Sequence, residues 1–277
     1  MTTFTFPGKI GDALHQWPVA FWWHLETGNA FDVWLDQTTC GPLKRLIEYQ
    51  EGVHEVRLME GIESYGCGGQ PWHFNIKPEE HEDRHFVHCG LRAFPQRQLT
   101  LQAFEDVPLT LEVDKKTIAE TPNLRAPELP KANRLVLHGT GVCQHNHQTP
   151  GFWRFLARNR GLLESRFDEI VFVGSPEDRD VGLMAYPGWQ AWDDGGEFLN
   201  LASYVQASRM MIGCGSSNVV VAGALKTSCI RVHDAIGEAP KVIWSNLGSN
   251  QRNETELELR GQMEALLDEL LTTEVTA

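Results

Sequence analysis

The sequence predicts an α/β protein in two halves, each built on a parallel sheet. Short apolar strands alternate with helical segments through most of the 277-residue chain, an order typical of parallel sheets. A break at residues 121–130, with three prolines in ten residues, separates two such series. A chain of this length forms one large or two small domains, so the break favours two.

The first half is expected to form a domain over residues 1–125. It opens with a strand at 3–6, turn residues, and a helix from about Asp12 to Glu26. The stretch 64–82, rich in Gly, Pro, Trp and His, is expected to be an extended loop. The other expected elements are three strands and one helix: strands 31–36, 53–58 and 85–88, helix 43–49.

The pattern restarts after the break, and a second domain is expected over residues 132–250. Strand 134–138 and helix 151–165 begin it. Three strands and two helices follow: strands 169–173, 210–212 and 229–233, helices 197–209 and 216–226. The segment 251–277 is expected to be a C-terminal helix that packs at the domain junction, because its leucines recur at helical spacing.

Composition excludes several classes of protein. The 42% apolar content supports a globular core, and the net charge of −13 disfavours a protein that coats nucleic acid. No apolar stretch reaches the ~20 residues of a membrane span, and the first residues show no signal-peptide pattern. Six dispersed cysteines without a CxxC pair indicate reduced thiols, so a cytoplasmic protein is expected.

The first candidate site follows the first strand, in the segment Lys9-Ile-Gly-Asp-Ala-Leu-His-Gln-Trp-Pro18. Glycines at the turn let a ligand approach the backbone. Asp12 has two readings that can coexist. It could cap the helix, or it could project from the carboxyl end of the strand and accept a proton from a substrate hydroxyl.

A second candidate is the turn Gly213-Cys-Gly-Ser-Ser-Asn218, where a strand passes through small residues into a helix. Free amides at a helix N-terminus favour phosphate, and Ser216 or Ser217 could cap the helix and add a hydroxyl donor. An ordinary capped helix is the alternative. The turn matches neither a Walker A loop nor the GxGxxG fingerprint.

Two more polar loops follow strands of the second half. Thr140 and Gly141 begin a loop that continues to His145 and His147, and a Gly174-Ser175 turn precedes Pro-Glu. All these loops follow strand carboxyl ends, so they could converge on one interdomain cleft.

Together these motifs resemble the lipopolysaccharide heptosyltransferase family, whose members are GT-B glycosyltransferases that use nucleotide-diphosphate sugars. The resemblance rests on the Gly-Asp-helix-Pro opening, the Gly174-Ser-Pro-Glu177 turn, and the segments 199–213 and 215–225. It implies two Rossmann-like domains facing a cleft, in a compact version. It also implies an inverting, metal-independent sugar transfer, with a nucleotide sugar and a glycan as partners, no metal, and no cofactor besides the co-substrate.

Site residues follow from that resemblance. Asp12 would be the general base. Donor-binding residues would come from three turns of the second half: Thr140, Gly141, His145, His147, Gly174, Ser175, Gly215, Ser216, Ser217 and Asn218. Acceptor-binding residues would surround Asp12: Lys9, Gly11, His15 and Gln16. The chain departs from the family at Cys214–Asn218, where an Asp-Ser/Thr-Gly triplet is usual, and in the next helix, where valines replace a His.

Other readings remain open. The acceptor could be a hydroxymethylated DNA base, although the net charge opposes a polyanion. The missing acid and His motivate a non-catalytic nucleotide-sugar-binding protein. The histidines at 81–88 and 145–147 do not match zinc spacing, so cleft-lining or solvated side chains are expected. Trp72, Trp189 and Trp192 could stack on a sugar or base, or be partly buried.

Overall fold

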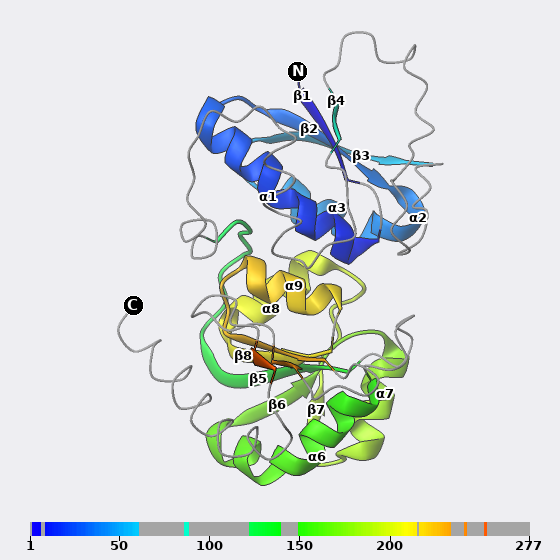
Figure 1. Ribbon diagram of the computed structural model, residues 1–277, viewed down its shortest axis with the longest axis vertical. Coiled ribbons are helices and arrows are strands. Elements are labelled where there is room, and N and C mark those ends of the chain that lie inside the picture. Colours follow the sequence, from blue (N-terminus) through cyan, green and yellow to red (C-terminus); the bar gives the residue numbers. More distant parts are fainter. Residues whose placement is uncertain are drawn as a thin grey trace. The chain divides into compact units, whose positions relative to one another are not determined.

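The computed structural model describes residues 2–6, 9–60, 86–88, 122–139, 149–214, 216–233, 241–242 and 252–253. The chain splits into two compact units, Met1–Ala126 with Glu197–Leu199, and Pro127–Gly196 with Asn200–Ala277. Each unit contains a largely parallel sheet flanked by helices (Figure 1), so the predicted α/β class is confirmed.

The first unit holds a parallel sheet in the order β3-β2-β1-β4. Its strands are β1 (Thr2–Phe6), β2 (Phe31–Asp36), β3 (Val53–Met59) and β4 (Phe86–His88). They lie where the sequence predicted strands. Its helices are α1 (Ile10–Thr27), α2 (Gln37–Cys40), the 3₁₀ turn η1 (Gly41–Leu43) and α3 (Lys44–Glu48), so the single helix expected at 43–49 is shorter and has two short neighbours.

Aromatic side chains form the core of the first unit. Phe4 and Phe6 of β1 are fully buried, and Phe31 of β2 packs edge-on against Phe4 with ring centroids 5.2 Å apart.

The start of the proline-rich break is hydrogen-bonded to this unit. The Gln50 side chain donates to the Arg125 carbonyl at 2.9 Å and accepts from the Arg125 amide at 2.8 Å. Residues 122–131 form no helix or strand. The two hydrogen bonds between Gln50 and Arg125 nevertheless hold the first half of this segment in place.

The second unit holds a sheet in the order β11-β10-β9-β8-β5-β6-β7. Its strands are β5 (Ala132–His138), β6 (Glu169–Phe172), β7 (Gln190–Ala191), β8 (Ser208–Gly213), β9 (Cys229–His233), β10 (Lys241–Val242) and β11 (Arg252–Asn253). Strands β5 to β9 run parallel, whereas β10 and β11 pair antiparallel at one edge. The parallel part carries the loops that the sequence singled out.

Among the described residues, four helices cover this sheet: α6 (Thr149–Arg166), α7 (Pro176–Ala185), α8 (Phe198–Ala207) and α9 (Ser217–Ala224). Figure 1 shows α6 and α7 on one face and α8 and α9 on the other. The helices change face because the chain runs outward from β5 through β6 to β7 and then crosses back to β8.

Three sequence expectations need correction here. The helix expected through Arg209 ends at Ala207, because Ser208 already pairs with Ala132 of β5 in the sheet. Helix α7 and strand β7 were not expected. The segment 251–277 begins with a strand, since Arg252 and Asn253 pair with β10; residues 254–277 lie outside the described residues.

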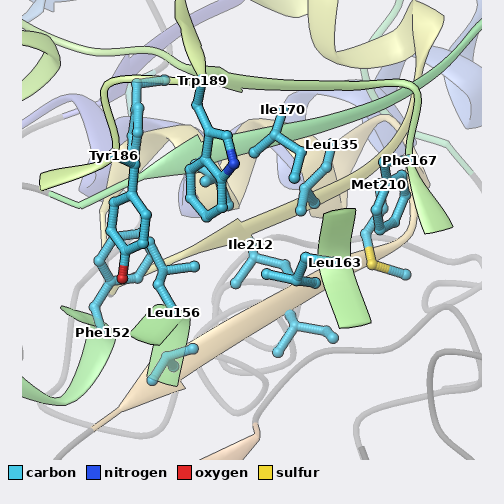
Figure 2. Packing of buried hydrophobic residues seen from close by; sticks show 14 of the residues in the cluster. Leu135, Phe152, Leu156, Leu163, Phe167, Ile170, Tyr186, Trp189, Met210 and Ile212 are labelled. Atoms are coloured by element: carbon cyan, nitrogen blue, oxygen red, sulfur yellow. The ribbon is translucent and has the colours of Figure 1, made fainter. Parts of the chain in front are cut away.

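One hydrophobic cluster of the second unit is formed by the sheet, by α6 and by the segment after α7 (Figure 2). Trp189 and Tyr186 stack with centroids 4.2 Å apart, and the Trp189 indole donates to Glu164 at 2.9 Å. Trp192 stacks on Tyr204 at 4.0 Å. Both tryptophans therefore already stack on tyrosines of this unit, and Trp72 lies outside the described residues.

Replacing either of two helical glycines with alanine should change the free energy of unfolding, but in opposite directions. A Cβ at Gly182 of α7 would lie 2.6 Å from the buried ring of Phe172, whereas a Cβ at Gly161 of α6 would meet nothing within 4 Å. Gly182→Ala should lower the free energy of unfolding by about 1–3 kcal/mol through overpacking. Gly161→Ala should raise it by about 1 kcal/mol through helix propensity. Urea denaturation of both variants checks the contrast, and changes of the same sign would contradict it.

Candidate functional site

The carboxyl ends of β8, β5 and β6 lie side by side in the second unit. From β5 the chain proceeds to β6 on one side, and from β8 it proceeds to β9 on the other. The helices that follow β5 and β8, which are α6 and α9, therefore cover opposite faces of the sheet. Such a switch point opens a crevice where open α/β sheets bind ligands.

His138, the last residue of β5, stands at this point and is 6% exposed. Its Nδ1 lies 2.8 Å from the hydroxyl oxygen of Ser216, and its Nε2 lies 3.9 Å from a carboxylate oxygen of Asp178. The imidazole therefore connects the turn after β8 with the start of α7.

The turn after β6 completes this arrangement. The Ser175 hydroxyl donates to Asp178 Oδ2 at 3.0 Å and accepts from the Asp178 amide at 3.2 Å, so it caps α7. We call Ser175, Asp178, His138 and Ser216 the polar chain. Gly174, at φ +123°, is needed beside it because a Cβ there would lie 2.8 Å from the His138 ring.

The N-terminus of α9 faces the same edge. Ser216 occupies the N-cap position, but its side chain makes no capping hydrogen bond because its hydroxyl is engaged by His138. The prediction that Ser216 caps the helix is therefore wrong for its side chain. The first amides of α9 keep their positive partial charge, which suits a bound anion.

Burial lowers the pKa of His138 to about 4, and the Asp178 charge opposes this only in part. At neutral pH the ring is therefore uncharged and carries a single N–H. The nitrogen that bears the proton decides whether Ser216 donates to the ring or accepts from it.

This low pKa predicts a pH-dependent stability. Between about pH 6.5 and pH 4 the unfolded chain binds a proton at His138 that the folded chain does not, so the free energy of unfolding should fall as the pH falls through this window. His138→Gln should flatten that dependence. Urea midpoints from pH 7 to pH 4 check this, and equal slopes in the two proteins would contradict it.

The first unit places the other predicted residues around the start of α1. The amide of Ala13 donates to the Lys9 carbonyl at 3.0 Å, so α1 begins at Ile10. Asp12 therefore lies inside the first turn rather than at the cap. Lys9 is exposed and Gly11 half-buried. The side chains of Asp12, His15 and Gln16 lie outside the described part of the structure, so the base assignment stays a prediction.

Of the predicted donor residues, Ser175 and Ser216 are linked through the polar chain. Ser217 and the buried Asn218 form the first turn of α9. Thr140, Gly141, His145, His147 and Gly215 lie outside the described residues. Sequence reasoning missed His138 and Asp178. For His138 a signal was available, because a polar residue that ends the apolar strand Leu135-Val-Leu-His138 lies at the end of the strand where ligands bind.

A possible metal group occurs elsewhere in the described residues, at Asp32, His54 and Glu55. His54 Nδ1 lies 2.9 Å from the buried Asp32 carboxylate, but Glu55 is paired with Arg57 at 2.8 Å. These residues stand at the amino ends of β2 and β3, opposite the edge where ligands of α/β sheets bind. The group therefore has no part in the switch-point site.

Two further sequence expectations concern thiols and membranes. The cysteines in the described part of the chain, Cys40, Cys214 and Cys229, are buried thiols. Among the described residues, no helix combines the length and apolar character that crossing a membrane requires.

Comparison with solved structures gives matches over the whole chain. A glycosyl transferase family 9 protein from Veillonella parvula aligns with a TM-score of 0.59 at 11% identity, covering 98% of this chain and 97% of that one. Escherichia coli ADP-heptose lipopolysaccharide heptosyltransferase II aligns with a TM-score of 0.57 at 12% identity, covering 99% of each. Escherichia coli heptosyltransferase WaaC with ADP aligns with a TM-score of 0.56 at 12% identity, covering 98% and 99%.

The chain has a GT-B fold. The expected resemblance to heptosyltransferases is thus confirmed at the level of the fold. No protein-family model and no curated protein matches the sequence. The likeness is therefore visible in three dimensions, at identities of 11–12%, and the activity has to be argued from the site.

Proposed function

We propose that the protein is a glycosyltransferase that moves a sugar from a nucleotide-diphosphate sugar to an acceptor hydroxyl. The observation that carries the proposal is the uncapped α9 N-terminus beside His138, at the switch point of the second sheet. The fold supports it, since structures aligning over the full chain are those of glycosyltransferases, one with ADP.

The proposed donor site binds the diphosphate through backbone amides. The amides of Ser216, Ser217 and Asn218 would face the phosphates, with the α9 macrodipole behind them. A helix terminus contributes roughly 0.3–2 kcal/mol, so cationic side chains must add to it. His145 and His147 are the proposed cations. This arrangement stabilises the charge that develops on the leaving diphosphate without a metal ion.

Asp12 is the proposed general base. Its carboxylate would take the proton of the acceptor hydroxyl as that oxygen attacks the anomeric carbon. The bond from that carbon to the diphosphate oxygen breaks, and the electron pair leaves with the nucleoside diphosphate. Attack from the face opposite the leaving group inverts the anomeric configuration. A carboxylate near the start of α1 suits this role, because α1 follows the carboxyl end of β1, and ligands of parallel α/β sheets bind at that end of the strands.

A thermal-shift panel tests the donor assignment. Nucleoside diphosphates and their sugars should raise the unfolding temperature, because a ligand at 100 times its Kd adds about 2.7 kcal/mol to stability. The unphosphorylated nucleosides serve as controls and should give smaller shifts. Equal shifts with and without the diphosphate would contradict an anion site.

Catalysis is tested separately by transfer or donor hydrolysis with the nucleotide sugar that binds. Turnover supports the transferase. Binding without transfer to any of a panel of acceptors would instead assign a nucleotide-sugar-binding protein. Cys214 favours that second candidate, because this fully buried thiol stands where the family usually has an acid.

A further inference from the structure

We propose that His138 is a positioning residue that takes up a proton when the diphosphate of a nucleotide sugar binds beside Ser216. The inference rests on the proposed function and adds a proton-linked control of the same site. Its basis is the geometry of the polar chain, in which one buried imidazole contacts both a carboxylate and the hydroxyl at the N-cap of α9.

The resting hydrogen-bond directions follow from the carboxylate. A neutral imidazole has one N–H, and placing it on Nε2 directs it toward Asp178, 3.9 Å away. The opposite tautomer would direct a lone pair at a negative charge. Nδ1 is then a bare acceptor, so the Ser216 hydroxyl donates to it across 2.8 Å. In this state the Ser216 proton points into the protein and only oxygen lone pairs remain for a ligand.

A bound phosphate requires the reverse arrangement. Phosphate oxygens are acceptors, so Ser216 can contribute only when its hydroxyl proton turns toward the ligand. Its oxygen then needs a donor from His138 Nδ1. Because Nε2 must keep its proton opposite Asp178, both ring nitrogens are protonated. Phosphate binding therefore favours the imidazolium, and an imidazolium favours phosphate binding.

The Asp178 carboxylate is positioned to balance the positive charge of a protonated His138. Its Oδ2 accepts a hydrogen bond from Ser175 at 3.0 Å, and its side chain is only 7% exposed. A fixed carboxylate beside a buried ring stabilises the cation, while burial opposes it. Without a ligand, burial lowers the pKa of the His138 ring more than the Asp178 charge raises it.

The other described neighbours of His138 add no charge. The amide of Cys214, directly after β8, donates to the His138 carbonyl at 3.1 Å, and the rings of Phe152 and Trp153 of α6 pack beside Gly139. Within the described residues, Asp178 supplies the electrostatic contribution to the ring's pKa. His145 and His147 lie outside these residues, so the test must separate their titration from that of His138.

Nucleotide sugars are suitable probes because their diphosphate is esterified at both ends. It lacks the second ionisation near pH 6 of a terminal phosphate, so any pH dependence comes from the protein. The affinities of ADP-glucose, UDP-glucose and GDP-mannose are measured by calorimetry at about pH 5 to 8 on the full chain. Uptake of one proton predicts an affinity that rises as the pH falls, by up to about tenfold per unit.

Variants assign the linkage to the polar chain. His138→Gln, Ser216→Ala and Asp178→Asn should each lose most of the pH dependence. Ser216→Ala keeps the ring and removes only the hydroxyl, so it covers the case in which His138→Gln fails to fold. His54→Gln is the matched control, because His54 also contacts a carboxylate but lies in the first unit, and it should keep the wild-type slope.

The outcomes separate the two proposals. A slope lost in Ser216→Ala and kept in His54→Gln supports the inference. Binding that is independent of pH, or a slope that survives in Ser216→Ala and His138→Gln, overturns the inference and leaves the proposed function standing. If none of the three probes binds the wild-type protein at any pH, the proposed function fails and the inference fails with it.

Discussion

Replacing Asp12 with Asn should lower the rate of sugar transfer by roughly 10²–10⁴-fold while leaving the affinity for the nucleotide sugar unchanged. Asparagine preserves the size of the side chain but cannot accept the proton of the acceptor hydroxyl. The donor diphosphate is expected at the second unit, so its binding does not depend on this carboxylate. Measurement of transfer rate and of donor Kd on the same preparation checks both parts.

Glu48→Gln is the control for this substitution. Glu48 is an exposed acid of the same unit, in an i,i+4 pair with Lys44, and its replacement should leave the transfer rate unchanged. Wild-type turnover in Asp12→Asn would remove Asp12 from the role of base. A parallel loss of donor affinity would instead indicate that the substitution disturbs more than proton transfer.

Gly174→Ala should weaken nucleotide-sugar binding by at least about tenfold and also destabilise the fold. The residue has φ +123°, outside the range that L-residues adopt readily, which costs roughly 1–3 kcal/mol. The new Cβ would also lie 2.8 Å from His138 and 3.3 Å from Asp178 Oδ2. The polar chain would have to shift, and Ser216 would lose its position at the anion turn.

Gly195→Ala separates the steric effect from backbone strain. Gly195 also has a positive φ, of +68°, but a Cβ there would meet nothing within 4 Å. This control should lose some stability and keep its donor affinity. Calorimetry and thermal unfolding on both variants check the comparison, and equal donor affinities would show that the polar chain does not support the binding turn.

The strands of the fold were predictable because their signal is local. Phe31–Asp36 and Cys229–His233 were located to the residue, since apolar runs bounded by turn residues mark buried strands. The end of α8 was not predictable in this way. Residues 208 and 209 carry no strand signal of their own, and pairing of β8 with β5 decides their conformation.

Helix α7 could have been predicted and was missed. Ser175-Pro-Glu-Asp178 combines an N-cap serine, a proline at the first helical position and acids in the first turn. The segment was interpreted only as a loop motif, so Asp178 was overlooked. His138 and Ser216 are 78 residues apart in the sequence, and they meet because β5 and β8 are neighbours in the sheet. This contact could not be predicted from local sequence patterns.

A crystal structure of the full chain with a bound nucleotide-diphosphate sugar tests the central claim most directly. We expect the diphosphate on the amides of residues 216–218, with a phosphate oxygen within about 3 Å of the Ser216 hydroxyl oxygen and that oxygen still in contact with His138 Nδ1. A diphosphate bound away from the carboxyl ends of β5 and β8, beyond hydrogen-bond distance of the Ser216 hydroxyl, would contradict the account.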